Sequence, residues 1–303
     1  MSIPEEQIRA YIPSAVRCCM GGGVFEKGVT ELRFSVGKRP MAVTRSGLEY
    51  ILGGENAGYV VRHVDIAEVA DCVSHGSMYS VNGSIVNGFV TVPGGHRIGF
   101  CGTAVYDDAG KIAHIKDISD ICIRVARQVI GCADGIAGEL YSGDVPSNIL
   151  IASPPGCGKT TMLRDTCRIL GNGSPRHRPL KVGIADERSE IAAVYNGESQ
   201  NDVGEASFVC TGYNKLHAIN IMLRAMSPDV IATDEIGSSD DFDAVQTAQR
   251  SGVSVVATAH ARSPDNLFEK FGKEKLHACF DRIIFLSKMS VADRIYRREN
   301  NDY

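Results

Sequence analysis

The chain has 303 residues, of which 44% are apolar, and it carries a formal net charge of −4 with an isoelectric point near 6.1. This length is comfortable for two folded domains, and the composition supplies ample apolar side chains for their cores. The acidic balance excludes a whole-protein electrostatic footprint for DNA or RNA, so we expect no nucleic-acid partner, although a local basic patch stays open.

Ten cysteines are scattered along the chain without a C-x-x-C pair or a zinc-ligand spacing, as expected of reduced core cysteines in a cytosolic protein. The first residues lack the basic and then apolar pattern of a signal peptide. No uninterrupted apolar run approaches the roughly 18 residues of a membrane span. We therefore expect a cytoplasmic protein that reaches the inner face of a membrane only through partners.

Residues 1–133 have a mixed pattern that predicts a smaller α+β domain. A helix is expected at 63–75, and strands are expected at 30–36, 41–44, 84–92, 98–106, 111–115 and 121–126. The stretch 131–147 carries four glycines and a proline, which is typical of a linker.

Residues 134–303 alternate strand, turn and helix, which predicts a mostly parallel sheet covered on both faces. Helices are expected at 160–170 and 214–226, after the capping box 238–241 and after the Ser-Pro pair 263–264. Strands are expected at 148–152, 182–185, 229–233 and 253–258, with 281–287 as the final core strand.

A glycine-rich loop stands between a predicted strand and a predicted helix, the context that the Gly-x-x-x-x-Gly-Lys-Thr motif requires. We expect it to bind the phosphates of ATP through Ser153, Pro154, Pro155, Gly156, Cys157, Gly158, Lys159, Thr160 and Thr161. The glycines let backbone N–H groups turn toward the phosphates. Lys159 is suited to the β and γ phosphates, and the Thr160 hydroxyl to Mg²⁺. Ser153 replaces the motif's first glycine at a position that only opens the loop.

Two acids, Asp234 and Glu235, end the apolar run that begins at Val230. Carboxylates at the carboxyl end of a strand face the crevice where open α/β sheets bind ligands. We expect Asp234 to help hold Mg²⁺ and Glu235 to orient or deprotonate the attacking water. The alternative is a solvated acidic strand end, but the position about 75 residues after Lys159 suits a catalytic pair.

A second acidic strand end holds Asp186, Glu187 and Glu190. Asp186 is a candidate metal ligand and Glu187 a candidate catalytic residue, while Arg188 offers a salt-bridge partner to any of these acids. The functional and the salt-bridge interpretations stay open.

His260 follows the strand expected beside Asp234 and Glu235. A lone histidine is more often structural, but at this strand end its imidazole is suited to sensing the γ phosphate through a hydrogen bond.

The order of these motifs resembles the secretion and pilus-assembly ATPases, which carry a phosphate loop, an acidic "Asp box", a Walker B strand and a "His box". The resemblance lies in 223–237, in 251–252 and 257–260, and in 31–40 of the first half. It puts 186–190 at the Asp box and His260 at the His box. Asp234 departs from that group, where glycine is usual before the glutamate, so the division of work between the two acids stays open.

The segments 88–102 and 227–237 are similar to the stage III AA family of sporulation proteins, and this likeness extends over nearly the whole chain. The resemblance implies a RecA-like P-loop ATPase core with a smaller N-terminal α+β domain, binding ATP and Mg²⁺. It also implies a homo-oligomer, as a hexameric ring. Such a ring would power or gate a secretion-like channel between mother cell and forespore, with membrane-embedded channel proteins as partners.

A ring ATPase needs an arginine from a neighbouring subunit to stabilise transition-state charge. Arg97 is the first candidate because it follows two glycines, and Arg124 and Arg127 are others. The alternative for each is a surface arginine.

Two rival functions stay open from sequence. One is an ATP-dependent nucleic-acid-handling protein, which salt-dependent nucleic-acid binding would support. The other is a scaffold that binds ATP without hydrolysing it, against which the paired acids argue.

Overall fold

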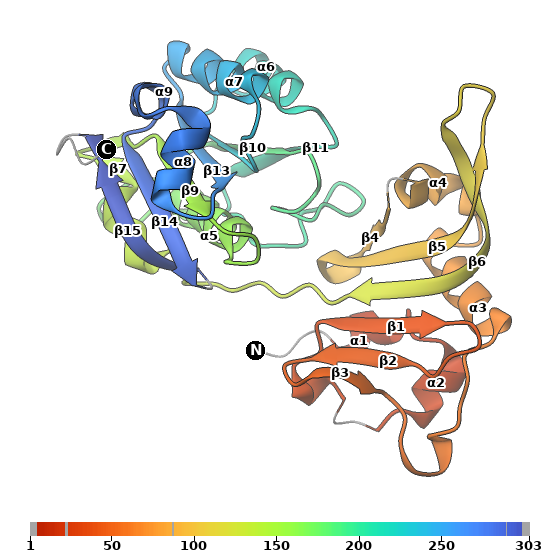
Figure 1. Ribbon diagram of the computed structural model, residues 1–303. Helices are drawn as coiled ribbons and strands as arrows, with labels where there is room; N and C mark the ends of the chain where they lie inside the picture. The colour runs from red at the N-terminus through yellow and green to blue at the C-terminus, as the bar shows by residue number, and fades with distance from the viewer. Residues whose placement is uncertain (1–4, 22–23, 87, 289, 299–303) are drawn as a thin grey trace. The chain divides into compact units, whose positions relative to one another are not determined.

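The computed structural model describes residues 5–21, 24–86, 88–288 and 290–298. The chain divides into two compact units, Met1–Arg127 and Gln128–Tyr303 (Figure 1). The division precedes the expected boundary at 133/134 because Ala133, Ile136 and Leu140 are buried in the core of the second unit. The prediction of a linker at 131–147 is therefore wrong, and residues 125–130 carry the chain across the division without helix or strand.

An antiparallel sheet forms the centre of the first unit, with six strands among the described residues, in the order β3-β2-β1-β6-β5-β4. Its core is a single apolar cluster in which side chains such as Phe34 and Ile98 are fully buried. The strands are β1 (Glu31–Ser35), β2 (Met41–Thr44), β3 (Gly47–Tyr50), β4 (Val90–Val92), β5 (His96–Tyr106) and β6 (Ile112–Arg124). The helices are α1 (Glu5–Arg9), α2 (Ser14–Cys19), α3 (His63–Ser74) and α4 (Met78–Val86), with 3₁₀ turns η1 (Phe25–Lys27), η2 (Gly54–Asn56) and η3 (Pro93–Gly95).

Two local predictions in this unit are wrong. The expected strand 84–92 is helical up to Val86, and only Val90–Val92 pair in the sheet. The β-branched residues Ile85 and Val86 favour a strand locally, but α4 is held by tertiary contacts with β6. One of them is the hydrogen bond that the Asn82 side chain donates to the carbonyl of Ala113, at 2.7 Å. The expected strands 111–115 and 121–126 form one continuous strand, β6, which is irregular near Asp117, where φ is 48°.

The second unit contains a seven-stranded sheet, counted over the described part of the chain, in the order β11-β10-β12-β13-β9-β14-β15. All neighbouring pairs are parallel except β14 with β15. The strands are β9 (Ile149–Ser153), β10 (Val182–Asp186), β11 (Ser207–Thr211), β12 (Val230–Thr233), β13 (Ser254–His260), β14 (Arg282–Lys288) and β15 (Val291–Arg297). The helices are α5 (Lys159–Asn172), α6 (Lys215–Ala225), α7 (Ser239–Arg250), α8 (Pro264–Phe271) and α9 (Lys273–Cys279), and a separate hairpin follows η4 (Asp134–Glu139) as β7 (Tyr141–Ser142) and β8 (Val145–Pro146).

Both faces of this sheet are covered, as the alternating pattern predicts. Along β9, Ile149 and Ile151 point into the core that contains Leu163 of α5. Leu150 of the same strand points into the opposite core, which includes Phe242 of α7 and residues of α6, α8 and α9. Figure 1 shows α5 on one side of the sheet and α6 and α7 on the other. The expectation of a mostly parallel, doubly covered sheet is confirmed.

The sheet extends beyond the predicted strands at both of its edges. Strand β11 lies outside β10 and was not expected, and β14 is not the last strand because β15 follows it as an antiparallel edge. Among the described residues, no helix combines the length and apolarity needed to cross a bilayer.

His96, the first residue of β5, is fully buried in the first unit. Its Nδ1 accepts the backbone N–H of Ala126 at 2.9 Å, so the neutral ring carries its proton on Nε2, which has no hydrogen-bond partner in the described chain. Burial lowers the pKa of His96 from 6.5 to about 4. Because protonation is easier in the unfolded chain, the stability that this neutral ring maintains is complete above pH 6.5 and is lost as the pH falls toward 4.

We therefore expect His96→Asn, whose amide oxygen can still accept from Ala126, to remove this acid sensitivity. Between pH 7.5 and pH 5 the wild-type chain should lose about 2 kcal/mol more unfolding free energy than the variant does. Urea unfolding of both proteins at the two pH values measures the difference. Equal pH dependence in the two proteins would contradict the assignment.

Candidate active site

The glycine-rich loop lies between β9, which ends at Ser153, and α5, which begins at Lys159. Gly156 and Gly158 have φ values of 76° and 86°, in the left-handed region that favours glycine. A Cβ built on Gly156 would meet no atom within 4 Å, so the space beside this part of the loop is open. The open loop and the positive end of α5 together suit a phosphate group.

Lys159 is buried among hydrogen-bond acceptors, with 7% of the residue exposed. Its Nζ donates to the carbonyls of Ser153 and Pro154, both at 3.2 Å, and lies 2.8 Å from Nδ1 of His260. It also lies 3.3 Å from the hydroxyl of Ser153, which gives that serine a contact that a glycine lacks. Burial lowers the pKa of Lys159.

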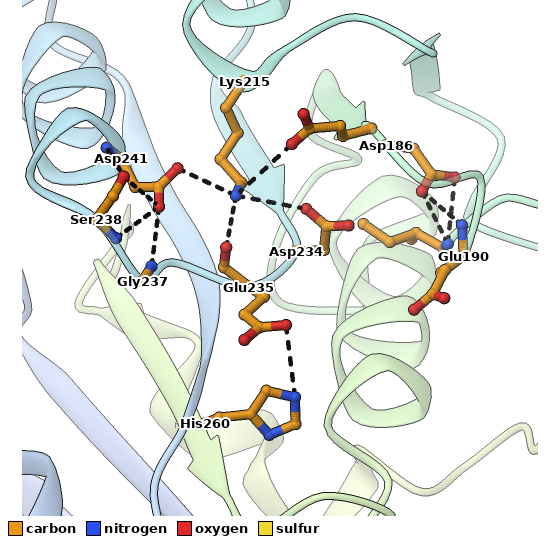
Figure 2. Close-up of polar contacts among 11 residues, drawn as sticks. Asp186, Glu190, Lys215, Asp234, Glu235, Gly237, Ser238, Asp241 and His260 are labelled. Atoms are coloured by element: carbon orange, nitrogen blue, oxygen red, sulfur yellow. Dashed lines mark hydrogen bonds and ion pairs between the residues drawn. The ribbon is translucent and has the colours of Figure 1, made fainter. Parts of the chain in front are cut away.

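His260 ends β13, where it pairs in register with Ser153 of β9. Because an ammonium can only donate, Nδ1 of His260 accepts from Lys159 and the ring proton sits on Nε2. That nitrogen faces Glu235, with Oε2 at 3.5 Å (Figure 2). Burial and the charge of Lys159 lower the pKa of His260, which favours the neutral ring. The structure thus brings the predicted lysine, histidine and glutamate together.

Asp234 and Glu235 follow β12, the strand between β10 and β13. Asp234 is buried, and its Oδ1 has no hydrogen-bond partner among the described residues. Burial raises the pKa of Asp234 to about 6, against the influence of Lys215. Nζ of Lys215 lies 3.8 Å from Oδ1 of Asp234, at ion-pair but not hydrogen-bond distance, so this oxygen can still accept a hydrogen bond or bind a hard cation, and the site fits Mg²⁺. Glu235 is more open, with 41% of its side chain exposed.

Lys215, which the sequence analysis did not single out, lies among the acids of this site. Its Nζ donates to the backbone carbonyl of Glu235 and to Oδ1 of Asp241 at 3.2 Å (Figure 2). It also lies 3.8 Å from Oδ1 of Asp234 and 4.0 Å from Oε2 of Glu187. The one sequence signal was a lysine at the first position of a helix, where the helix dipole disfavours a cation.

Asp186 is fully buried at the end of β10. Its two carboxylate oxygens accept the backbone N–H groups of Glu190 at 2.7 Å, Ile191 at 3.1 Å and Ala192 at 2.9 Å. This geometry favours a role in holding the acidic loop over the predicted direct contact with Mg²⁺. The side chain of Glu187 is 45% exposed and lies at ion-pair distance, 4.0 Å, from Nζ of Lys215.

The remaining predicted residues lie where the motif requires them or outside this unit. Thr160 is half-buried at the second position of α5 and stays a predicted Mg²⁺ ligand. Within the described residues, no group of three or more His, Cys, Asp or Glu side chains could hold a metal ion by itself. Mg²⁺ in nucleotide sites usually takes only one or two protein carboxylates. Arg97 lies in the first unit on β5, with its guanidinium 4.5 Å above the ring of Phe89, and its role stays a prediction.

Comparison with known proteins identifies the family of this chain. Residues 4–300 match the family described as "Sporulation stage III, protein AA". The chain belongs to this family. It is 34% identical over 278 residues to Stage III sporulation protein AA of Bacillus subtilis, covering 90% of this chain and 88% of that protein. It is also 33% identical over 151 residues to Protein SEEDLING PLASTID DEVELOPMENT 1 of Arabidopsis thaliana, covering 48% of this chain and 20% of that protein.

Solved structures show the fold of this stage III AA family member. The Legionella pneumophila ATPase DotB superposes with a TM-score of 0.56 at 16% identity, over 85% of this chain and 72% of that one. The pilus retraction motor PilT with bound ADP gives a TM-score of 0.58 at 16% identity, over 86% and 75%. The predicted fold class is confirmed: α/β, with a RecA-like P-loop core and a smaller N-terminal α+β domain.

The loop-anchoring role of Asp186 predicts a stability effect that requires no metal. In Asp186→Asn, one acceptor oxygen is replaced by a donor that faces buried backbone N–H groups. The free energy of unfolding should therefore fall by about 2–3 kcal/mol in metal-free buffer. Urea denaturation measures the change, with the exposed Glu187→Gln as the control, expected within about 0.5 kcal/mol of wild type. Unchanged stability of Asp186→Asn would contradict the loop-anchoring role and favour the prediction that Asp186 is a metal ligand.

Proposed function

We propose that this protein is a Mg²⁺-dependent ATPase of the secretion type. The observation that carries the proposal is the convergence of Lys159, His260 and Glu235 at the carboxyl ends of three neighbouring parallel strands. A lysine on a glycine-rich loop, a buried carboxylate with one oxygen that accepts no hydrogen bond in the described residues, and a more open glutamate are the parts that phosphoryl transfer requires. They come from separate segments of the chain, so chance does not explain their meeting.

The chain's own residues divide the work. The loop backbone and Lys159 bind the phosphates, and Asp234 with Thr160 would hold Mg²⁺, which would supply positive charge to neutralise the phosphate oxygens. Glu235 orients the attacking water and accepts its proton, since its carboxylate is the exposed one of the acidic pair.

His260 is proposed as the sensor of the γ phosphate. It now accepts a hydrogen bond from the ammonium that the phosphates also attract. A change in the position of Lys159 therefore changes the hydrogen bond of His260 and, through Nε2, its relation to Glu235.

The proposed biological setting draws on the family membership of the chain. We propose that the protein acts as a homo-oligomeric, hexameric ring at the cytoplasmic face of a membrane, and that it powers or gates a secretion-like channel between mother cell and forespore. Its partners would be the membrane-embedded channel proteins. The family membership and the shared fold of DotB and PilT support this proposal.

Two substitutions test the catalytic assignment. Glu235→Gln should lower ATP turnover by about 10²–10⁴-fold because it removes the base but keeps the shape. Lys159→Ala should lower turnover by at least about 10²-fold and weaken nucleotide binding as well. Steady-state phosphate release and fluorescent-nucleotide titration measure both, with the exposed pair Glu205→Gln and Lys181→Ala as matched controls.

Turnover that both substitutions leave unchanged would show that the assigned roles are wrong. Tight nucleotide binding without turnover by the wild-type protein, also in its assembled state, would instead favour an ATP-binding scaffold. Hydrolysis stimulated by DNA or RNA in a salt-dependent manner would revive a nucleic-acid-handling function.

The ring predicts a different result for Arg97. Arg97→Ala should lower turnover by about 10³-fold or more when the protein is assembled, without weakening nucleotide binding by the monomer. Mixing Arg97→Ala with Glu235→Gln subunits should restore part of the activity. At some mixed interfaces the Arg97→Ala subunit supplies an intact Glu235 and its neighbour supplies an intact Arg97. Light scattering with a non-hydrolysable ATP analogue reports assembly, and absence of restoration would rule out action in trans.

A further inference from the structure

Lys215 occupies a position that is unfavourable for a lysine in two ways. It is the first residue of α6, whose start is capped by Asn214 through a 2.9 Å hydrogen bond from the N–H of His217. The positive end of a helix dipole repels a cation. The side chain is also only 10% exposed, and burial disfavours its charged form. Such a placement persists only where the surroundings compensate for it.

The compensation comes from four oxygen atoms that belong to three separate segments. The Nζ donates to the backbone carbonyl of Glu235 and to Oδ1 of Asp241. The third donor of the ammonium faces Asp234 and Glu187, which lie at ion-pair distance. Figure 2 shows the ammonium at the centre of this set, between the turn after Glu235 and the acidic loop that contains Asp186 and Glu190.

Asp241 extends this tie into the turn after Glu235. Its Oδ2 accepts the backbone N–H groups of Gly237 and Ser238, both at 2.9 Å, and the Ser238 hydroxyl at 2.9 Å. Burial acts to raise the pKa of Asp241, but these hydrogen bonds bring it below its ordinary value, so the carboxylate stays charged. Asp241 also completes the capping box of α7.

The segment 235–238 is thereby held at three points. Lys215 binds its first carbonyl, at Glu235, and through Asp241 it binds the two amides at its end. Between them, the N–H of Ile236 donates to the carbonyl of Thr258 on β13 at 2.7 Å. One ammonium contacts two of these three attachments, directly at the Glu235 carbonyl and through Oδ1 of Asp241 at the other, and the segment they hold carries the proposed catalytic base.

We propose that Lys215 is a positioning residue, which ties the Glu235 main chain and Asp241 into one rigid turn and so aims the Glu235 carboxylate at its working position beside His260. The effect on turnover rests on the proposed ATPase function, whereas the tie itself does not. Lys215 acts through Glu235 and need not touch the nucleotide.

The tie is tested by amide hydrogen exchange of the full-length protein. In Lys215→Met, which keeps the apolar stem and removes the ammonium, the amides of Gly237 and Ser238 should exchange at least about tenfold faster. The amides of Ile191 and Ala192, which Asp186 holds, should not change and serve as an internal control. Lys181→Met, at an exposed lysine, should leave all four amides unchanged.

The consequence for turnover is tested in two backgrounds. Lys215→Met should lower kcat by about 10–100-fold, with little change in nucleotide affinity measured without Mg²⁺, because the phosphate loop is untouched. Added to Glu235→Gln, the same substitution should lower kcat by no more than about twofold, since a residue that acts through Glu235 has nothing left to position. A general structural role would lower kcat equally in both backgrounds.

The outcomes separate the two proposals. Unchanged exchange at Gly237 and Ser238 overturns the positioning role, whatever the turnover. If the amides exchange faster in Lys215→Met but the wild-type protein does not turn over ATP, the tie is established and the ATPase function is overturned instead. Should Lys215→Met fail to fold, Lys215→Arg keeps the charge and should retain both the protection and most of the turnover. If neither variant folds, or if Lys215→Arg loses the protection as completely as Lys215→Met does, the specific role is overturned.

Discussion

The parallel register of β12, β13 and β9 is the constraint on which the rest of the site depends. Thr233 pairs with Ala257, and His260 pairs with Ser153, so the carboxyl ends of the three strands finish at one edge of the sheet. Because adjacent strands lie about 4.8 Å apart, side chains just beyond these ends are brought within reach of one another. Lys159 reaches His260 across one strand boundary, and His260 faces Glu235 across the next.

Several carboxylates lie close together at that edge, and two buried lysines, Lys159 and Lys215, offset their mutual repulsion. Burial raises the pKa of Asp234, and the neighbouring acids raise it further. Lys215 offsets this from one side of β12, and Lys159 lies on the other side, toward His260. Both cations donate to protein oxygens, but they differ in their surroundings: Lys215 lies among the acids after β12, whereas Lys159 belongs to a loop that is open beside Gly156.

Much of this arrangement could be predicted from the sequence, because strand ends and motif spacing are local signals. The loop, the paired acids and His260 were each placed by the apolar run that precedes them. Lys215 was not, since its role depends on where the start of α6 lies relative to β12, and the intervening strand β11 was not recognised. Strand β11 lies at the edge of the sheet and all its residues are only partly buried, and its run of three apolar residues, Phe208–Cys210, is too short to mark a strand by itself. The helix α4 was mistaken for strand for a related reason: its Ile85 and Val86 favour strands locally, and tertiary packing decides otherwise.

The same limit applies to the phosphate loop itself, whose shape is fixed partly by a hairpin far along the chain. Ser290, in the connection between β14 and β15, donates its N–H to the carbonyl of Cys157 at 2.8 Å and its hydroxyl to that of Gly158 at 3.2 Å. A Cβ on Gly158 would lie 2.2 Å from that hydroxyl, so glycine is required there by packing as well as by its φ. The motif's second glycine therefore answers two constraints at once. The left-handed φ of Gly158 follows from the local motif. Its packing against Ser290 arises only when the connection between β14 and β15 folds against the loop, so the sequence motif does not predict it.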